Sequence, residues 1–174
     1  MATRSPQLLV IEAGSDQAPL SAAVARGARS GLSVYTAQDS PEGIAYLAGL
    51  PPFDDRGLHA VPDLILLDPV VPEADGLEVL TWIRNAQPEL DVPVVVVTAS
   101  SSTADADRAQ TLGAREVHRK PDDLDELSGL VRSIIDRWIG VIQMIGAHLG
   151  AMGCLLYTSP SPRDQRGSRM PSSA

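Results

Sequence analysis

The sequence predicts an α/β fold, a doubly wound (βα)5 arrangement in which five strands form a parallel sheet and five helices cover it. Three observations predict this fold. Short aliphatic runs such as Leu64–Leu67 and Val94–Val97 are typical of strands that are buried on both faces. Segments with apolar residues at helical spacing separate these runs, which indicates right-handed strand–helix–strand crossovers. Aromatic residues make up only 3% of the 174 residues, so aliphatic side chains must fill the core.

The first half of the chain supplies two strand–helix units and a third strand. Ser40 is a suitable N-cap residue, and Pro41 after it suits the first helical position. Three prolines, a glycine and two aspartates predict a surface loop before the third strand. In order, we expect a strand at Gln7–Ile11, a helix at Ala18–Ala28, a strand at Leu32–Ala37, a helix from Ser40 to Leu50, a loop at Pro51–Pro62 and a strand at Asp63–Leu67.

The second half continues the alternation. Leu77, Leu80 and Ile83 share one face of the third predicted helix, and Gly113 ends the fourth. We expect a helix at Gly76–Arg84, a strand at Val94–Val97, a short polar helix at Thr103–Leu112, a weak edge strand at Glu116–His118 and a last helix from Asp122 to about Trp138.

The composition divides the chain into three parts. Residues 1–138 are long enough for one domain. Residues 139–153 are largely apolar and are expected to continue the last helix, packing on the domain or on a second copy in a homodimer. Residues 154–174 are rich in Ser, Pro and Arg, which predicts disorder, and they resemble the in-frame translation of a sequencing-library adapter. We therefore expect a non-native tail whose Cys154 has no role.

Charge and cysteine content exclude several classes of function. The formal net charge of −8 repels nucleic acid, so no nucleic-acid partner is expected. The N-terminus shows no signal-peptide pattern, and the apolar extension is short and interrupted for a membrane span, so we expect a cytoplasmic protein without a membrane partner. A single cysteine excludes an internal disulfide framework and argues against a metal cluster.

Polar residues end three of the predicted strands. Asp68 follows the third strand, Thr98 the fourth and Lys120 the fifth, while Glu12 follows the first. Because the carboxyl ends of parallel strands meet at one edge of a sheet, we expect these side chains to converge. Lys120 is the only lysine in the chain, which favours a specific role for it.

This combination of groups suits phosphoryl transfer. Asp68 can accept a phosphoryl group when a divalent cation neutralises the incoming charge, and Mg²⁺ prefers carboxylate, carbonyl and water oxygens. Glu12 would help to hold that cation. Thr98 can donate its hydroxyl to a phosphoryl oxygen, and Lys120 can reach the same group with its ammonium charge or pair with Asp68 at rest.

Four segments resemble the receiver domain of two-component response regulators, the CheY-like family: LLVIEAG, PDLILLDPVVPEADGLEVL, VVVVTAS and GAREVHRKP. The loop Pro51–Pro62 and the end of the last helix at Ile135–Trp138 resemble those of small stand-alone receivers that partner phytochrome-type histidine kinases. The resemblance implies a flavodoxin-like strand order 2-1-3-4-5, a sensor histidine kinase as partner and weakly held Mg²⁺. It also implies that Asp68 is the phosphoacceptor, Thr98 the switch residue, Lys120 the phosphate-contacting lysine and Val70 a carbonyl ligand for the metal.

Two positions depart from the family pattern. Ala13 replaces the second residue of an acidic pair, which should weaken Mg²⁺ binding unless Asp16 substitutes for it. Val117 replaces an aromatic residue that moves with the switch threonine. His118, on an edge strand, is expected to be a surface or interface residue and no phosphotransfer group. Ala13 and Val117 both favour an alternative function, that of a pseudo-receiver, which binds partners with little or no phosphorylation.

Enzymes with related folds fit less well. A phosphatase of the haloacid-dehalogenase type would need a second aspartate at position 70, where the chain has Val70. A flavodoxin would need a hydroxyl-rich phosphate loop after the first strand, and residues 12–16 are too acidic and too few for that. We therefore expect a phosphoacceptor signalling domain and no enzyme.

Overall fold

The computed structural model describes residues 4–13, 18–28, 30–69 and 76–155, with side chains as far as residue 140. Strands and helices alternate through this part of the chain. The strands are β1 (Gln7–Ile11), β2 (Ser33–Ala37), β3 (Leu64–Leu67), β4 (Val94–Thr98) and β5 (Glu116–Arg119). The helices are α1 (Pro19–Gly27), α2 (Ser40–Ala48), α3 (Glu78–Ala86), α4 (Thr103–Thr111) and α5 (Leu124–Leu155).

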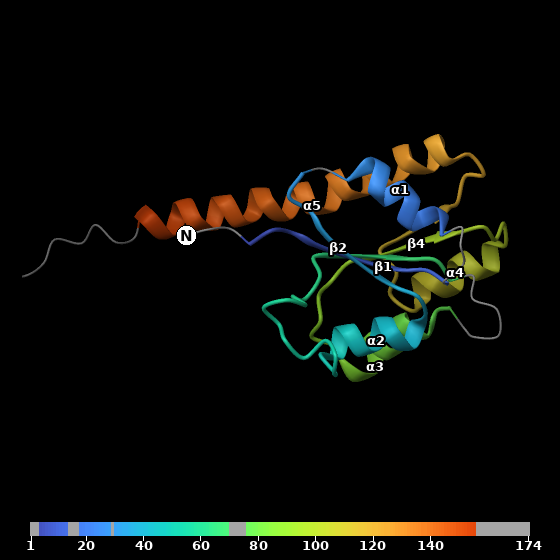
Figure 1. Ribbon diagram of the computed structural model, residues 1–174, viewed down its shortest axis with the longest axis horizontal. Helices are drawn as coiled ribbons and strands as arrows, with labels where there is room; N and C mark the ends of the chain where they lie inside the picture. Colours follow the sequence, from blue (N-terminus) through green and yellow to red (C-terminus); the bar gives the residue numbers. More distant parts are fainter. Residues whose placement is uncertain (1–3, 14–17, 29, 70–75, 156–174) are drawn as a thin grey trace, which may run out of the picture. The chain divides into compact units, whose positions relative to one another are not determined.

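The strands form one parallel sheet in the order β2-β1-β3-β4-β5. The predicted fold class and strand order are therefore confirmed. Figure 1 shows α1 and the first part of α5 on one face of the sheet, with α2 and α3 on the other. This placement is the doubly wound arrangement that alternating strands and helices produce.

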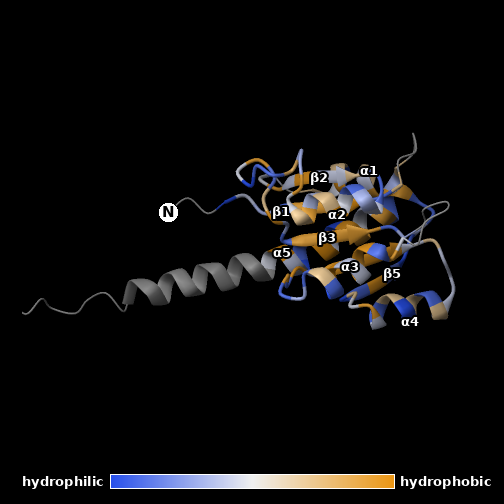
Figure 2. Cartoon of the chain, turned by 90° about the horizontal axis from the view of Figure 1, so that it is seen from below, coloured by the Kyte–Doolittle hydropathy of each residue, from blue (hydrophilic) through white to orange (hydrophobic). Residues whose placement is uncertain are grey.

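Each central strand contributes to two cores because successive side chains point to opposite faces. In β1, Leu9 and Ile11 pack with α2 and α3, whereas Leu8 and Val10 pack with α1 and α5. The valines of β4 alternate in the same way. Figure 2 shows the apolar character of the central sheet. Burial on both faces explains why these strands are continuous aliphatic runs in the sequence.

The start of α2 differs from the prediction. Asp39 is the N-cap, and its side chain accepts a hydrogen bond of 2.7 Å from the backbone N–H of Glu42. Ser40 is already helical, so the assignment of Ser40 as the cap was wrong by one residue. The carboxylate of Glu42 in turn accepts the backbone N–H of Gln38, the residue before the cap, at 2.7 Å.

The loop between α2 and β3 is held by an aromatic cluster. The rings of Tyr35, Tyr46, Phe53 and His59 lie within 4.8–6.0 Å of one another, centroid to centroid. Arg56 donates hydrogen bonds to the carbonyls of residues 46 and 47 at the end of α2. The predicted surface loop is therefore present, and Phe53 anchors it in the core.

The last helix, α5, extends beyond the segment from Asp122 to about Trp138 that was predicted for it. It begins at Leu124, two residues later than expected, and continues to Leu155, so Cys154 is helical and was not expected to be. The chain divides after Val141 into two units, the first of which contains the whole sheet. Residues 156–174, the rest of the predicted tail, lie outside the described residues. No helix in the described part of the chain combines the length and hydropathy that crossing a membrane requires.

Candidate phosphoacceptor site

The four predicted polar residues lie at one edge of the sheet. Glu12 follows β1, Asp68 follows β3, Thr98 ends β4 and Lys120 follows β5. Backbone hydrogen bonds continue the parallel ladder into the site. The N–H of Asp68 donates to the carbonyl of Ile11 at 2.9 Å, and the N–H of Lys120 donates to that of Thr98 at 2.8 Å. The register of the sheet thus brings together residues that are far apart in the sequence.

The ammonium group of Lys120 lies beside two buried carboxylates. It is ion-paired with Asp68, and its Nζ is 3.8 Å from Oε1 of Glu12. The side chains of Glu12, Asp68 and Lys120 are only 3%, 6% and 13% exposed. Charges that are shielded from water interact strongly, and a charge left unpaired there is strongly unfavourable. The single charge of Lys120 therefore offsets only part of the negative charge of the two acids.

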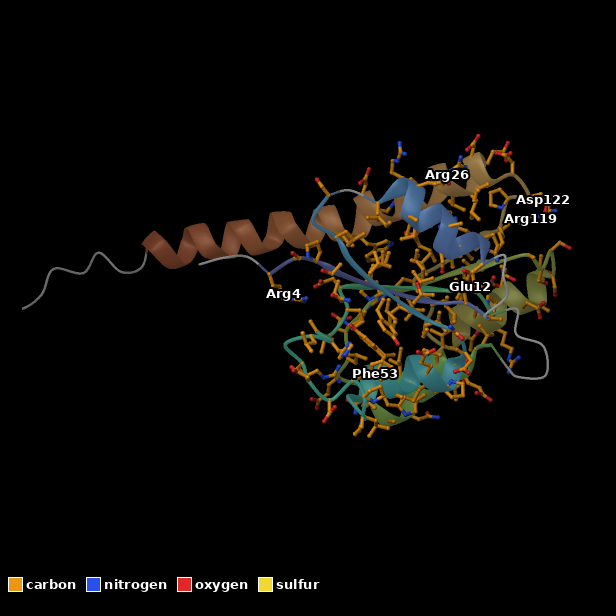
Figure 3. All side chains as sticks on the ribbon, in the orientation of Figure 1. Arg4, Glu12, Arg26, Phe53, Arg119 and Asp122 are labelled. Atoms are coloured by element: carbon orange, nitrogen blue, oxygen red, sulfur yellow. The ribbon has the colours of Figure 1, made fainter. Side chains whose placement is uncertain are left out.

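Glu12 also caps the start of α1. Its Oε1 accepts the backbone N–H of Leu20 at 2.8 Å, and its Oε2 accepts the N–H and the hydroxyl of Ser21 at 2.9 and 3.1 Å. Ala18, the N-cap residue by position, makes no side-chain cap. Figure 3 shows Glu12 and Arg119 at the same end of the sheet. Sequence reasoning missed Ser21, although a helix that begins without a polar cap indicates that another group supplies it.

Thr98 is buried and is tied to the start of α4. Its Oγ1 accepts the backbone N–H of Ser100 at 3.0 Å, and the hydroxyl of Ser100 donates to Oδ2 of Asp105 at 2.7 Å. Ser102 caps α4 by accepting the backbone N–H of Asp105 at 3.3 Å. The hydroxyl of Thr98 is therefore connected to the first turn of α4 by hydrogen bonds.

A hollow of about 420 Å³ lies between β4, β5 and α4. Val117 lines it together with Thr98, Ala109 and Arg108. Val117 also packs against the core on this face of the sheet. A valine leaves more of this space open than an aromatic ring would.

Two further predicted positions cannot be placed. Val70, the predicted carbonyl ligand, and Asp16, the predicted substitute carboxylate, lie outside the described residues. Ala13, beside Glu12, is partly buried and brings no ligand atom to the site beyond its backbone.

The chemical type of the side chains at this edge suits a hard cation, which prefers oxygen ligands. Glu12 and Asp68 offer carboxylate oxygens, which Mg²⁺ prefers. Within the described residues, no group of three or more His, Cys, Asp or Glu side chains is arranged to hold a metal. Among the described residues, this edge therefore offers Mg²⁺ the two carboxylates beside Lys120, and a set of two suits weak binding.

A second cluster fixes β5 against α5. Glu116 accepts hydrogen bonds from Arg137 at 2.7 and 2.8 Å and from Trp138 at 3.1 Å, and its Oε2 lies 2.6 Å from Nε2 of His118. Burial raises the pKa of Glu116, but the hydrogen bonds and charges of His118 and Arg137 outweigh burial and hold the pKa below its usual value. His118 is thus partly buried at this internal contact. This cluster, which was not predicted, holds the strand that leads into Lys120.

The response regulator receiver domain family matches residues 9–132. The transcriptional regulatory protein DltR of Streptococcus agalactiae is 35% identical over 127 residues, which cover 72% of this chain and 50% of DltR. The chain therefore spans half the length of that relative.

Two solved structures are similar over most of the domain. The phosphorylated cyanobacterial phytochrome response regulator RcpA superimposes with a TM-score of 0.68 and 28% identity, covering 78% of this chain and 95% of RcpA. The Mn²⁺-bound form of the response regulator Rcp1 has a TM-score of 0.65 and 26% identity, covering 76% and 94%. Family match, identity and strand order agree, and we conclude that the chain belongs to the response-regulator receiver family of two-component systems.

Proposed function

We propose that Asp68 accepts a phosphoryl group from a sensor histidine kinase and that the phosphorylated domain signals through protein–protein contacts. One observation carries the proposal: Asp68 is a buried carboxylate at the carboxyl end of a central strand, paired with the only lysine of the chain. Receiver domains are signalling domains, and the solved structure of RcpA is of a phosphorylated relative.

The reaction is a direct transfer. A carboxylate oxygen of Asp68 forms a bond to the phosphorus of a phosphohistidine, and the bond from that phosphorus to the imidazole nitrogen breaks, with its electron pair returning to the ring. Lys120 exchanges its contact with the unphosphorylated carboxylate for one with a phosphoryl oxygen. The hydroxyl of Thr98 donates a hydrogen bond to another phosphoryl oxygen. A bound Mg²⁺ would neutralise charge on the phosphoryl group, and Glu12, Asp68 and the carbonyl of Val70 are the groups proposed to hold it.

The proposed partners follow from the same comparison. The name of RcpA associates it with a phytochrome, which supports a phytochrome-type kinase as the donor for this chain. We further propose that a second copy binds through residues 139–153, and that the acidic domain itself binds neither nucleic acid nor membrane in the cytoplasm. No turnover of an external substrate is part of this function.

The test is phosphorylation by a small phosphodonor. The chain is incubated with acetyl phosphate and MgCl₂, and its intact mass is measured over time. We expect the gain of one phosphoryl group in the wild type and in Asp91→Asn, a control whose aspartate is an exposed partner of Arg115. We expect no gain in Asp68→Asn. An Asp68→Asn variant that gains the same mass would exclude Asp68 as the acceptor.

The alternative of an unphosphorylated pseudo-receiver is not favoured by the comparisons. Two residues still support it: Ala13, which stands where the family has a second acid after β1, and Val117, which replaces the aromatic residue. Failure to gain mass at any concentration of MgCl₂ would favour it.

A further inference from the structure

The carboxylate of Glu12 is bound in the way that helix N-termini bind free anions. Leu20 N, Ser21 N and Ser21 Oγ all donate to its two oxygens at 2.8–3.1 Å. The free N–H groups and the positive end of the helix dipole stabilise negative charge at this position. Here the anion is part of the same chain, eight and nine residues away from its donors.

This arrangement fixes a side chain that would otherwise be free to rotate. A glutamate has three side-chain torsions, and its flexibility weakens it as a ligand unless other contacts hold the carboxylate. In Glu12 both oxygens are held from the side of α1, while Lys120 lies 3.8 Å from Oε1 on the side of the site. The carboxylate therefore has a set position between helix and site.

Ser21 is the part of this support that depends on a side chain. Its hydroxyl supplies one of the three hydrogen bonds, and the other two come from the backbone. Groups that hold metal ligands in position commonly change metal affinity when they are removed, even though they do not touch the metal. Ser21 is a helical residue and is partly exposed, so its substitution disturbs the core little.

We propose that Ser21 is a positioning residue for the cation site: its hydroxyl and N–H fix the Glu12 carboxylate where Glu12 and Asp68 share a divalent cation. With Ala13 in place of an acid, Glu12 and Asp68 are the two carboxylates that lie beside Lys120 among the described residues, so the position of Glu12 determines a large part of the affinity. This inference depends on the cation site of the proposed function, but its test uses no phosphodonor, so the two can fail separately.

The test is a titration of the full-length, ¹⁵N-labelled chain with MgCl₂ at constant ionic strength, followed by NMR. We expect Ser21→Ala to weaken binding about tenfold, and Ser21→Thr, which keeps the hydroxyl, to restore most of the affinity. Ser133→Ala is the matched control, since Ser133 is an exposed serine of α5 whose hydroxyl donates to its own helix. It should bind as the wild type does.

A second measurement needs no variant. In the wild type, the amide resonances of Leu20 and Ser21 should shift with the same midpoint as the resonance of Asp68. Unchanged or tighter binding by Ser21→Ala, no rescue by Ser21→Thr, an equal loss in Ser133→Ala, amides of Leu20 and Ser21 that do not respond, or a wild type that does not bind would each overturn the proposal.

Discussion

The backbone N–H of Ser100 donates a hydrogen bond to Oγ1 of Thr98 at 3.0 Å. Because the oxygen already accepts this bond, the hydroxyl proton of Thr98 is left to be donated elsewhere. The buried end of β4 thus presents a donor at the edge where Asp68 lies.

The first prediction concerns this donor. Thr98→Ala should slow phosphorylation by acetyl phosphate by about tenfold or more, because a fixed donor to the developing phosphoryl charge is lost. Thr98→Ser keeps the hydroxyl and should retain most of the rate. The rates are read from intact mass over time. Equal rates for the alanine and wild-type chains would show that the hydroxyl has no part in the transfer.

The second prediction concerns the charge balance around Lys120. Lys120→Gln leaves the carboxylates of Asp68 and Glu12 without their cation and should lower the free energy of unfolding by about 3 kcal/mol. The double variant Asp68→Asn/Lys120→Gln should be less destabilised than Lys120→Gln alone, since one of the two charges is gone. Urea unfolding at neutral pH measures both. Additive effects of the two substitutions would mean that the ion pair is not coupled.

The third prediction uses the pH dependence of Glu116. Its pKa is lower in the folded chain than its ordinary value of 4.5, so its ionised form stabilises the fold. This contribution is complete above pH 4.5 and is lost as the pH falls through the lower, folded-state pKa. Glu116→Gln should therefore lower the free energy of unfolding by about 1–2 kcal/mol at pH 7, and the difference from wild type should shrink in acid.

Urea unfolding between pH 7 and pH 3 tests this prediction. Glu126→Gln is the control, because Glu126 is an exposed residue of the same helix that Glu116 contacts. A difference between Glu116→Gln and wild type that stays constant down to pH 3 would contradict the assigned shift.

The fourth prediction concerns the close approach of Gly76 to the segment after Asp68. A Cβ added at Gly76 would lie 2.0 Å from the backbone oxygen of Pro69, so Gly76→Ala must displace this backbone. We expect a loss of about 1–3 kcal/mol in unfolding free energy together with slower phosphorylation. Gly129→Ala meets no atom within 4 Å in helix α5 and should instead gain up to about 1 kcal/mol. Thermal unfolding compares the two, and a neutral Gly76→Ala would be the contrary result.

The strands and their shared edge could be predicted because each depends on local pattern and one general rule. Leu64–Leu67 and Val94–Val97 can be recognised without any partner, and parallel strands present their carboxyl ends together. The sequence alone therefore predicts the common edge at which Glu12, Asp68, Thr98 and Lys120 lie. The cap of α2 was misplaced because Asp39 and Ser40 are both good caps, and only the backbone conformation decides between them.

The contacts that support the site could not be predicted in this way. Glu12 accepts a hydrogen bond from Ser21, nine residues later, and Glu116 accepts one from Trp138 of α5, which packs beside β5. Both depend on tertiary geometry that no spacing in the sequence specifies. Val117 was singled out by resemblance alone. The hollow beside it is formed in part by α4, whose position the sequence does not specify.

Because the chain has a single lysine, chemical modification of Lys120 can report on what happens at Asp68. Apart from the α-amine, Lys120 Nζ is the only aliphatic amine that an acylating reagent can modify, and in the resting domain it is held beside Asp68 and is 13% exposed. Any event at Asp68 that draws the ammonium away from the carboxylate changes the reactivity of the amine and its access to the reagent. The rate of acylation at Lys120 Nζ therefore reports whether Asp68 is modified, and peptide mass mapping can measure this rate without an engineered label.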